Sequence, residues 1–449
     1  MTRVPCRLAA TAVLGLFAVL PLGAAQGRGG GGGGGSTPPP VTVVNPTAFD
    51  CYSGSGCLDP AFGSLGKVLV DVGSDTKTIF ALAVQSDGKI VAAGYRIAAS
   101  DNWSWVIGRF SSAGVVDTTF GTGGFVTLDI TPSGGELPRE LAIQPDGRIV
   151  VAGRLNDLPT VVRLTSGGAL DTSFGTGGKV VVGWAGVYSV GGLAIQSDGK
   201  IIVSGVASGV GTYVRRLGAT GITDKTFGSK GDRLISNVFI TDLALQSTGR
   251  IVAAGSHSSG NAVVARLTDS GTLDNSFGSK GITQADFGSP NDVFLELSVA
   301  SDDSQAAVGI AIDTSTSGSG NMAVGRFSAS GAPVTTFGSN GRVLLDMHGW
   351  NDRANGVAVQ SDGRVLFSGW AYTASGGRKN AIVGRLLGNG TLDTSFGAGG
   401  VTETEFGALL HGEPITMLTS GGQLIVGGGV GQSTSPPVNE LWMLLRYFQ

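Results

Sequence analysis

The sequence predicts an all-β fold, a seven-bladed β-propeller with four antiparallel strands in each blade. Three observations carry this prediction: a Phe-Gly unit that recurs seven times, an apolar hairpin within each unit, and two end segments that complement each other. Repeated units of this kind, rich in short strands, are typical of propeller blades. We expect the propeller to occupy residues 58–449.

The repeat is marked by seven Phe-Gly pairs separated by 50 to 60 residues. The phenylalanines are Phe62, Phe120, Phe174, Phe227, Phe277, Phe337 and Phe396. A β-sandwich does not need seven equal units, and the repeats of a solenoid are usually shorter. The spacing therefore favours the propeller over both alternatives.

Each unit contains the same four strands in the same order. A short apolar strand such as 67–72 follows the Phe-Gly pair, and after a variable loop come two strands joined by a tight turn, as in "LAIQPDGRIVVAG" (141–153). The unit then continues to a strand that ends in Arg and a large apolar residue, such as "VVRL" (161–164). Asp-Gly between apolar runs predicts a type I′ turn, which needs positive φ at both central residues. The hairpins at 298–309 and 416–428 lack both the Gln and the Asp-Gly pair, so we expect looser turns there.

The two ends of the repeated region predict how the ring closes. The region opens with a fourth strand that has no blade of its own (58–72), and it ends in a third strand, "LWMLLRYFQ", with no fourth strand after it. We therefore expect residues 66–72 to pair with residues 441–447. Such pairing removes the unpaired edges that an open sheet would expose.

On these motifs the chain resembles the delta-60 repeat family of bacterial secreted and surface proteins. The likeness rests on "LDxSFGxxGxV", "ALAVQxDGKIVVAG" and "VxRL", and it covers about residues 58–449. The resemblance implies a β-propeller fold. It implies little about activity, and no catalytic or binding residue is carried over from it.

The N-terminal residues predict export. Arg3 and Arg7 precede an apolar run from Leu8 to Leu22 and the small residues 23–25, a pattern typical of a signal peptide at 1–25. The run is short for a membrane anchor, so we expect no transmembrane segment in the mature protein and a periplasmic, cell-surface or extracellular location. Residues 26–57 are expected to form a disordered Gly/Pro-rich linker.

Two of the three cysteines, Cys51 and Cys57, follow the predicted signal peptide. In an exported chain, two nearby cysteines favour a disulfide. A metal site is the alternative, but no histidine or further cysteine lies near them, and two thiols alone bind metal poorly. We expect neither a metal site nor a cofactor in this chain.

Composition and motif context exclude two classes of ligand. The net charge is −3 and charged residues make up only 14% of the chain, so no basic surface is expected to attract nucleic acid. The glycine-rich "LDTSFGTGGKV" (170–180) looks like a phosphate loop, but such loops lead into a helix, whereas this one leads into a strand. We therefore interpret it as a connector within the repeat.

An arginine and an aspartate recur around each connector. The arginines are Arg109, Arg163, Arg216, Arg266, Arg326, Arg385 and Arg446. The aspartates are Asp59, Asp117, Asp171, Asp224, Asp274 and Asp393, and Val334 takes this position in the sixth copy. We expect a structural Arg–Asp bridge in each unit, because buried charges need partners. A ring of anion-binding arginines is the alternative.

The loops between the fourth and first strands, and between the second and third, are predicted to share one face of the ring. They carry six aromatic residues that we take as candidate binding residues: Trp103, Trp184, Tyr188, Trp350, Trp370 and Tyr372. Exposed aromatic side chains on such a face favour recognition of a glycan, a peptide or another protein. Packing of these loops against the blade ends is the alternative.

The first strand of each blade should line the central channel. One aligned position along it holds Ala81, Glu140, Gly192, Asp242, Glu296, Gly356 and Ile415. Arg139 lies beside the three carboxylates in this register, and clustered carboxylates can support the acid–base chemistry of a hydrolase or lyase. They can equally line a hydrated channel. We favour an exported, non-enzymatic binding module and keep the enzyme as the alternative.

Overall fold

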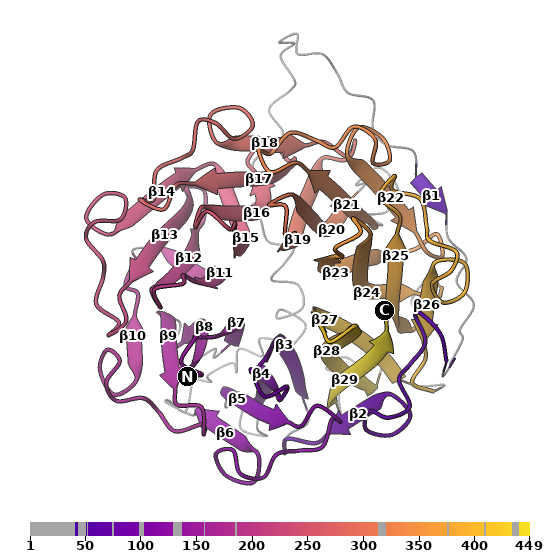
Figure 1. Ribbon diagram of the computed structural model, residues 1–449, viewed down its shortest axis with the longest axis horizontal. Coiled ribbons are helices and arrows are strands. Elements are labelled where there is room, and N and C mark those ends of the chain that lie inside the picture. Colours follow the sequence, from indigo (N-terminus) through magenta and orange to yellow (C-terminus); the bar gives the residue numbers. More distant parts are fainter. Residues whose placement is uncertain are drawn as a thin grey trace, which may run out of the picture.

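The computed structural model describes residues 41–43, 51, 53–73, 76–97, 103–128, 137–156, 158–184, 186–312, 320–374, 377–407, 410–432 and 440–449. Seven antiparallel sheets surround a central axis, which confirms the seven-bladed β-propeller (Figure 1). The signal peptide predicted for residues 1–25 lies outside the described residues, as does most of the predicted linker.

The first strand of each blade lies nearest the axis, and the second strand lies beside it (Figure 1). The first strands are β3 (Thr76–Val84), β7 (Leu137–Ile143), β11 (Val187–Ile195), β15 (Val238–Leu245), β19 (Asn291–Val299), β23 (Asp352–Val359) and β27 (Leu410–Ser420). The second strands are β4 (Ile90–Ile97), β8 (Ile149–Leu155), β12 (Ile201–Ala207), β16 (Ile251–His257), β20 (Gln305–Ile312), β24 (Val365–Tyr372) and β28 (Gln423–Gln432).

The third and fourth strands complete each blade toward the outside of the ring. The third strands are β5 (Trp103–Phe110), β9 (Leu158–Leu164), β13 (Gly211–Leu217), β17 (Ala262–Leu267), β21 (Gly320–Phe327), β25 (Lys379–Leu386) and β29 (Leu441–Phe448). The fourth strands are β6 (Phe125–Leu128), β10 (Lys179–Val181), β14 (Asp232–Ser236), β18 (Ile282–Ala285), β22 (Arg342–Asp346), β26 (Val401–Thr404) and β2 (Lys67–Val70).

The core consists of seven apolar clusters, each lying between two neighbouring blades. Second strands such as β8 are buried on both faces, because a blade contacts a neighbour on each side. A strand buried on both faces reads as a continuous apolar run, which explains "IVVAG" in β8. The fold thus spreads its core around the ring and leaves the two ends of the blades for loops and turns.

The ring closes between the two ends of the repeated region, as predicted. β2 pairs antiparallel with β29, with Lys67 opposite Leu445 and Val70 opposite Trp442. Blade 7 therefore consists of three strands from the end of the chain and one strand from its beginning. This pairing occupies the edge that β29 would otherwise expose.

Parts of the segment predicted to be a disordered linker are ordered. β1 (Val41–Val43) pairs in parallel with β22 and adds a fifth strand to blade 5. Residues 53–57 lie in a turn that hydrogen-bonds to the blades. The prediction of disorder throughout 26–57 is therefore wrong for these residues, because glycine-rich composition does not reveal backbone partners supplied by the propeller.

The hairpin turns differ from the predicted type I′. In blade 1 the N–H of Gly88 donates to the carbonyl oxygen of Gln85 at 2.9 Å, which closes a turn over residues 85–88. Of these four residues Gly88 has positive φ, at 82°. This is a type I turn followed by a left-handed residue. In blade 5 the left-handed position is held by Asp303, with φ of 63°.

Blade 7 has the one type I′ hairpin turn among the seven hairpins, although it lacks Asp-Gly. Gly421 and Gly422 have φ of 58° and 75°, and they lie between the paired residues Ser420 and Gln423. The turn is therefore tighter than its counterparts, not looser. Because this turn is shorter than the others, the residues of β27 are shifted by one position relative to the other first strands when the blades are aligned on the structure instead of on the sequence.

Every first strand contains a β-bulge at the same height, at Phe80, Arg139, Gly191, Thr241, Leu295, Asn355 and Ile415. The residue before each bulge pairs with a glycine of the second strand, for example Ile240 with Gly255. A Cβ at Gly255 would lie 2.0 Å from the carbonyl oxygen of Phe239, so only glycine fits. The bulge at Ile415 also makes Thr416, rather than Ile415, the counterpart of Glu140.

Candidate functional site

We call the end of the ring that carries the hairpin turns and the third-to-fourth-strand turns the turn face, and the opposite end the loop face. On the turn face the recurring arginines and aspartates are paired. The Nε–Oδ2 distances are 2.9 Å for Arg109–Asp117, 2.8 Å for Arg163–Asp171, 2.9 Å for Arg216–Asp224, 3.0 Å for Arg266–Asp274 and 2.8 Å for Arg385–Asp393. In the sixth pair, Arg446 Nη2 lies 2.8 Å from Asp59 Oδ2.

The same arginines connect each blade to the next. Arg109 Nη1 donates to the carbonyl oxygen of Ser166 in blade 2 at 2.6 Å, and its guanidinium lies 4.8 Å from the ring centroid of Phe120. The N–H of Gly121 donates to the carbonyl oxygen of Gly167 at 3.0 Å. The glycine-rich connector thus uses its donors within the scaffold, which leaves them unavailable to a phosphate.

Arg326 is the arginine without an aspartate, because Val334 occupies that position. Its Nη1 donates instead to Ser304 Oγ at 2.9 Å and to the carbonyl oxygen of Gln305 at 3.0 Å. Burial lowers the pKa of Arg326, since no carboxylate replaces the missing partner at bonding distance.

The six candidate aromatic residues lie at loop-face ends of strands or in loop-face loops, but on three different blades. Trp103 belongs to blade 1, Trp184 and Tyr188 to the entry of blade 3, and Trp350, Trp370 and Tyr372 to blade 6. They therefore do not form a single site. Trp350 is 41% exposed, whereas Trp103, Tyr188 and Tyr372 are half-buried.

Two of the six aromatic residues are buried, so the expectation that they are exposed is wrong. Trp184 is 9% exposed: its ring stacks on Tyr213 at 6.0 Å, its Nε1 donates to Asp232 Oδ1 at 3.1 Å, and Arg215 lies 5.2 Å from its centroid. Trp370 is 8% exposed and is covered by Lys379, whose Nζ lies 4.4 Å from the ring centroid. These two residues pack the blade ends.

The channel brings together the carboxylates of Glu140, Asp242 and Glu296 with the guanidinium of Arg139, closely enough to affect one another's pKa. Burial raises the pKa of Glu140 and Glu296, and the charge of Asp242 raises both further. Burial also raises the pKa of Asp242, to about 7. Burial thus favours the protonated form of all three carboxylates.

Asp242 also joins two blades. Its Oδ1 accepts from the N–H of Leu243 at 2.6 Å, and its Oδ2 accepts from the N–H of Leu297 in blade 5 at 2.8 Å. Both oxygens are thus engaged by the backbone, which fits a structural carboxylate better than a proton-transfer group. This geometry gives no support to the hydrolase or lyase alternative.

A mixed cluster of charged and aromatic side chains lies on the loop face where blades 6, 7 and 1 meet, and we call it the rim cluster. It comprises Tyr95, Trp103, Arg353, Trp370, Tyr372, Lys379, His411, Glu413 and Glu440. Lys379 forms an ion pair with Glu413 and lies 5.4 Å from the ring centroid of Tyr372. Its backbone N–H donates to His411 Nδ1 at 3.1 Å. The cluster thus connects blade 6 to blade 7.

The rim cluster continues into blade 1. Tyr95 stacks on Trp103 with ring centroids 5.1 Å apart, and burial together with the charges of Glu440 and Glu413 raises the pKa of Tyr95. Glu440 Oε2 accepts from the backbone N–H of Lys77 at 2.9 Å, and burial raises the pKa of Glu440 to about 7. Burial and the nearby Arg139 lower the pKa of Arg353 to about 10.

Sequence reasoning missed Lys379, Glu413 and Glu440, because none of them belongs to the repeat. It also missed His348, whose Nε2 lies 3.2 Å from Glu403 Oε1. Glu403 and its hydrogen-bonding partner Asn380 are buried, with Asn380 Nδ2 2.8 Å from Glu403 Oε1. One signal in the sequence could have pointed to this group: Glu403 is an acidic residue within a fourth strand, at a position where blade 5 has the apolar Leu344.

Across the described part of the chain, no three His, Cys, Asp or Glu side chains are grouped so that they could hold a metal ion. In the same residues, no helix has the length and apolar character needed to cross a bilayer.

Seven blades of four antiparallel strands, one of them extended by β1, form a closed ring and define the class of the protein as a seven-bladed β-propeller. Five segments match the family model described as "Domain of unknown function (DUF5122) beta-propeller": residues 85–120, 144–174, 196–227, 246–277 and 360–396. These five segments are similar to the repeats of this β-propeller model, which is consistent with the delta-60-like pattern of the motifs. The two hairpins that are not matched are those of blades 5 and 7, which lack both the Gln and the Asp-Gly pair.

Two solved structures of other proteins are similar to this chain. A catalytically inactive variant of virginiamycin B lyase from Staphylococcus aureus, with quinupristin, has a TM-score of 0.51 at 14% identity and covers 84% of this chain and 98% of that one. The BP39L lectin from Burkholderia pseudomallei has a TM-score of 0.43 at 10% identity, over 82% of this chain and 99% of the lectin. No curated protein matches the sequence. At these identities the likeness shows the fold alone.

Proposed function

We propose that this protein is an exported, non-enzymatic binding module that holds its ligand on the loop face, over the rim cluster of blades 6, 7 and 1. The observation that carries the proposal is the difference between the two faces. The repeated charges of the turn face are paired with one another, whereas the loop face presents aromatic side chains without counterparts in the repeat.

The residues expected to contact the ligand are Trp350, Tyr372 and Trp103. Trp350 is exposed in the loop before β23, and the other two are half-buried. The ring centroid of Tyr372 lies 5.4 Å from Lys379 Nζ, and Trp103 stacks on Tyr95. Aromatic faces next to hydrogen-bonding groups suit a ligand that has both apolar surfaces and hydroxyl or amide groups. A glycan and a peptide both have this chemistry, and the arms of the experiment separate them.

The experiment is to apply the purified protein to a glycan array and to a peptide array. We expect retention on one of them and at least a tenfold loss of affinity for Trp350→Ala or Tyr372→Ala. Tyr188→Ala is the matched control, since Tyr188 is a half-buried aromatic residue on the loop face of blade 3. Its affinity should stay within about twofold of the unchanged protein.

Three outcomes would contradict the proposal. One is silence on both arrays. The second is an equal loss of affinity in all three variants, which would mean that the rim cluster is not the binding surface. The third is turnover of a retained ligand that disappears in Glu140→Gln, which would identify an enzyme acting through the channel.

A further inference from the structure

The seven turns between third and fourth strands are alike, but one of them is not continuous with the third strand. Six are internal to the chain, at residues 111–114, 165–168, 218–221, 268–271, 328–331 and 387–390. In blade 7 the third strand is β29, and the fourth strand is β2 from the other end of the chain. The turn of blade 7 must therefore come from the residues before β2.

Residues 53–56, "SGSG", occupy the place of this seventh turn. Gly56 lies three residues before Asp59, as Gly114 lies three residues before Asp117. A Cβ at Gly56 would lie 2.9 Å from Phe396 Cδ1, and a Cβ at Gly114 would lie 2.9 Å from Phe62 Cε2. Each glycine thus lets its turn rest on the connector phenylalanine of the preceding blade.

The hydrogen bonds to the preceding blade are also the same. The N–H of Gly397 donates to the carbonyl oxygen of Ser55 at 2.9 Å, as the N–H of Gly63 donates to that of Ala113 at 2.9 Å. Arg385 Nη1 donates to Ser55 Oγ at 2.9 Å, whereas connector arginines such as Arg109 donate to a backbone carbonyl oxygen of the turn. Blade 6 therefore holds residues 53–56 as it would hold an ordinary turn.

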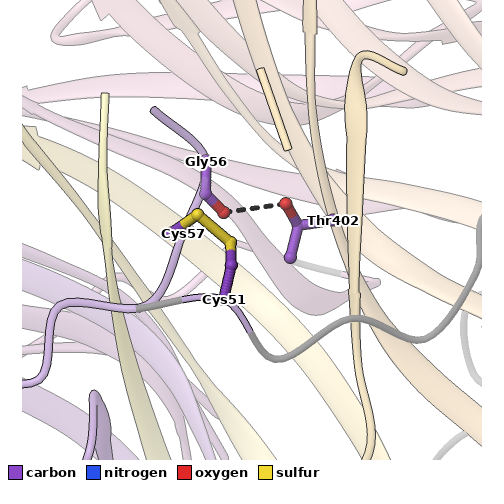
Figure 2. Close-up of a disulfide and its surroundings, with 4 residues drawn as sticks. All are labelled: Cys51, Gly56, Cys57 and Thr402. Carbon is purple, nitrogen blue, oxygen red and sulfur yellow. Dashed lines mark hydrogen bonds between the residues drawn. A yellow bond between two sulfur atoms is a disulfide. The ribbon is translucent and has the colours of Figure 1, made fainter. Parts of the chain in front are cut away.

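The seventh turn is also attached to the end of β29 and to β26. The N–H of Gly56 donates to the carbonyl oxygen of Phe448 at 2.8 Å, and the N–H of Phe448 donates to that of Cys57 at 2.9 Å. Thr402 Oγ1 donates to the carbonyl oxygen of Gly56 at 2.7 Å (Figure 2). These contacts place the turn at the seam where the ring closes.

What the seventh turn lacks is a peptide connection to the third strand of its blade, β29. In the six other turns the third strand supplies that connection. Here the disulfide between Cys51 and Cys57 joins the leading end back onto the residue after the turn (Figure 2). The N–H of Leu58 donates to the carbonyl oxygen of Cys51 at 3.0 Å. The disulfide thus closes the turn into a covalent loop, while hydrogen bonds connect that loop to the end of β29.

We propose that the loop closed by Cys51 and Cys57 is a redox-sensitive clasp that supplies the missing turn of blade 7 and locks the ring. A dithiol can open it by thiol–disulfide exchange: the S–S bond breaks, both cysteines gain a proton and an electron, and the dithiol is oxidised to its own disulfide. The seventh turn is then held by hydrogen bonds alone. Residues 53–70 loosen, while the other blades stay folded.

The test is hydrogen–deuterium exchange of the folded, full-length protein before and after reduction with dithiothreitol, with reduction verified by alkylation of the two thiols. We expect exchange to rise at least tenfold in residues 53–70, with a smaller rise at 397–402 and at the end of β29. The double variant Cys51→Ser/Cys57→Ser should show the same pattern without reductant.

Thr402→Val is the matched control. It removes one hydrogen bond to the turn, and valine already holds the aligned position in blades 1, 2, 5 and 7, at Val126, Val180, Val343 and Val68. Its exchange should rise less than that of the reduced protein and only near residue 56.

Unchanged exchange at 53–70 after complete reduction would refute the clasp. A uniform rise over all seven blades would refute it as well, because the disulfide would then be a general stabiliser. Neither result depends on whether the loop face binds a ligand.

Discussion

The two faces of the ring are built from opposite ends of the same strands, yet they use charge in opposite ways. On the turn face, Asp117 and Asp224 have a pKa lowered to about 2 by hydrogen bonds from threonine hydroxyls and by the charge of their arginines. Toward the loop face, Asp292, Asp352 and Glu440 have a pKa raised to about 7 by burial. The pKa of these carboxylates is thus lowered at one end of the ring and raised at the other.

The difference follows from what each face must contact. A turn-face residue binds the next blade, so its side chain is constrained by a neighbour that is itself a copy of the repeat. A loop-face residue follows a loop of variable length and meets different partners in each blade. The repeat therefore preserves the connectors, and a binding surface has room to differ only at the other end.

The largest effect should come from breaking a connector on the turn face. Asp171→Asn leaves the buried guanidinium of Arg163 without its carboxylate, and removing one partner of a buried ion pair costs about 3–5 kcal/mol. Urea denaturation should show this loss. Asp87→Asn on the same face is the control, because the side chain of Asp87 is 52% exposed and its loss should change stability by no more than about 0.5 kcal/mol. Equal effects of the two substitutions would contradict the role of the connector.

The second effect is a pH dependence of stability that has opposite signs for a carboxylate on the turn face and for one in the channel. Because the pKa of Asp224 is lowered to about 2, its stabilisation is present above its unfolded pKa near 3.8 and is lost as pH falls toward 2. Asp224→Asn should therefore cost more stability at neutral pH than near pH 2, in denaturation curves measured at both pH values.

In the channel, Asp242 has a raised pKa of about 7, so its contribution is most favourable below pH 4 and declines as pH rises through 7. Asp242→Asn should flatten that decline in denaturation curves measured between pH 4 and 8. A variant that steepened it would show that the carboxylate is ionised in the folded protein, contrary to the effect of its burial.

A smaller effect should come from repairing the one incomplete connector. Val334→Asp places a carboxylate where five other blades pair one with the Nε of the arginine, and Thr336 already stands two residues later to cap it. We expect a gain of about 1 kcal/mol, since a charge-assisted hydrogen bond to Arg326 replaces the packing of one valine. Denaturation midpoints compared with those of Val334→Asn would separate the charge from the change in shape.

The smallest effect on stability should come from the loop face. Trp350→Ala removes a side chain that is 41% exposed, so the free energy of unfolding should change by no more than about 0.5 kcal/mol. The same substitution is expected to weaken ligand binding strongly. A large loss of stability in this variant would show that Trp350 packs the blade end, as Trp184 does.

The sequence predicted what the repeat encodes. Seven copies of Phe-Gly determined the number of blades, and the unpaired strands at 66–72 and 441–447 predicted how the ring closes. It could not distinguish two kinds of turn, because Asp-Gly is compatible both with type I′ and with a type I turn followed by a left-handed glycine. The shorter turn at Gly421 and Gly422 then shifted one channel position from Ile415 to Thr416.

The candidate site could be predicted only in part, for a physical reason. Whether a loop-face aromatic residue is open depends on a neighbour outside the repeat: Arg215 and Tyr213 cover Trp184, and Lys379 covers Trp370. These neighbours do not follow the repeat, so the repeat pattern of the sequence does not predict them. The carboxylates of the channel were placed correctly along the strand, but the backbone donors that occupy Asp242 were visible only in the structure.

The seventh turn has a consequence for how the chain can be cut and rejoined. The backbone nitrogen of Gly56 lies 2.8 Å from the carbonyl oxygen of Phe448, so the first and last residues of the propeller are neighbours in space. A gene that fused residue 449 to residue 53, and opened the protein at the turn 218–221 instead, should give a circular permutant with the same seven blades and no need for either cysteine. The starting blade is thus a property of the gene, and the propeller itself has none.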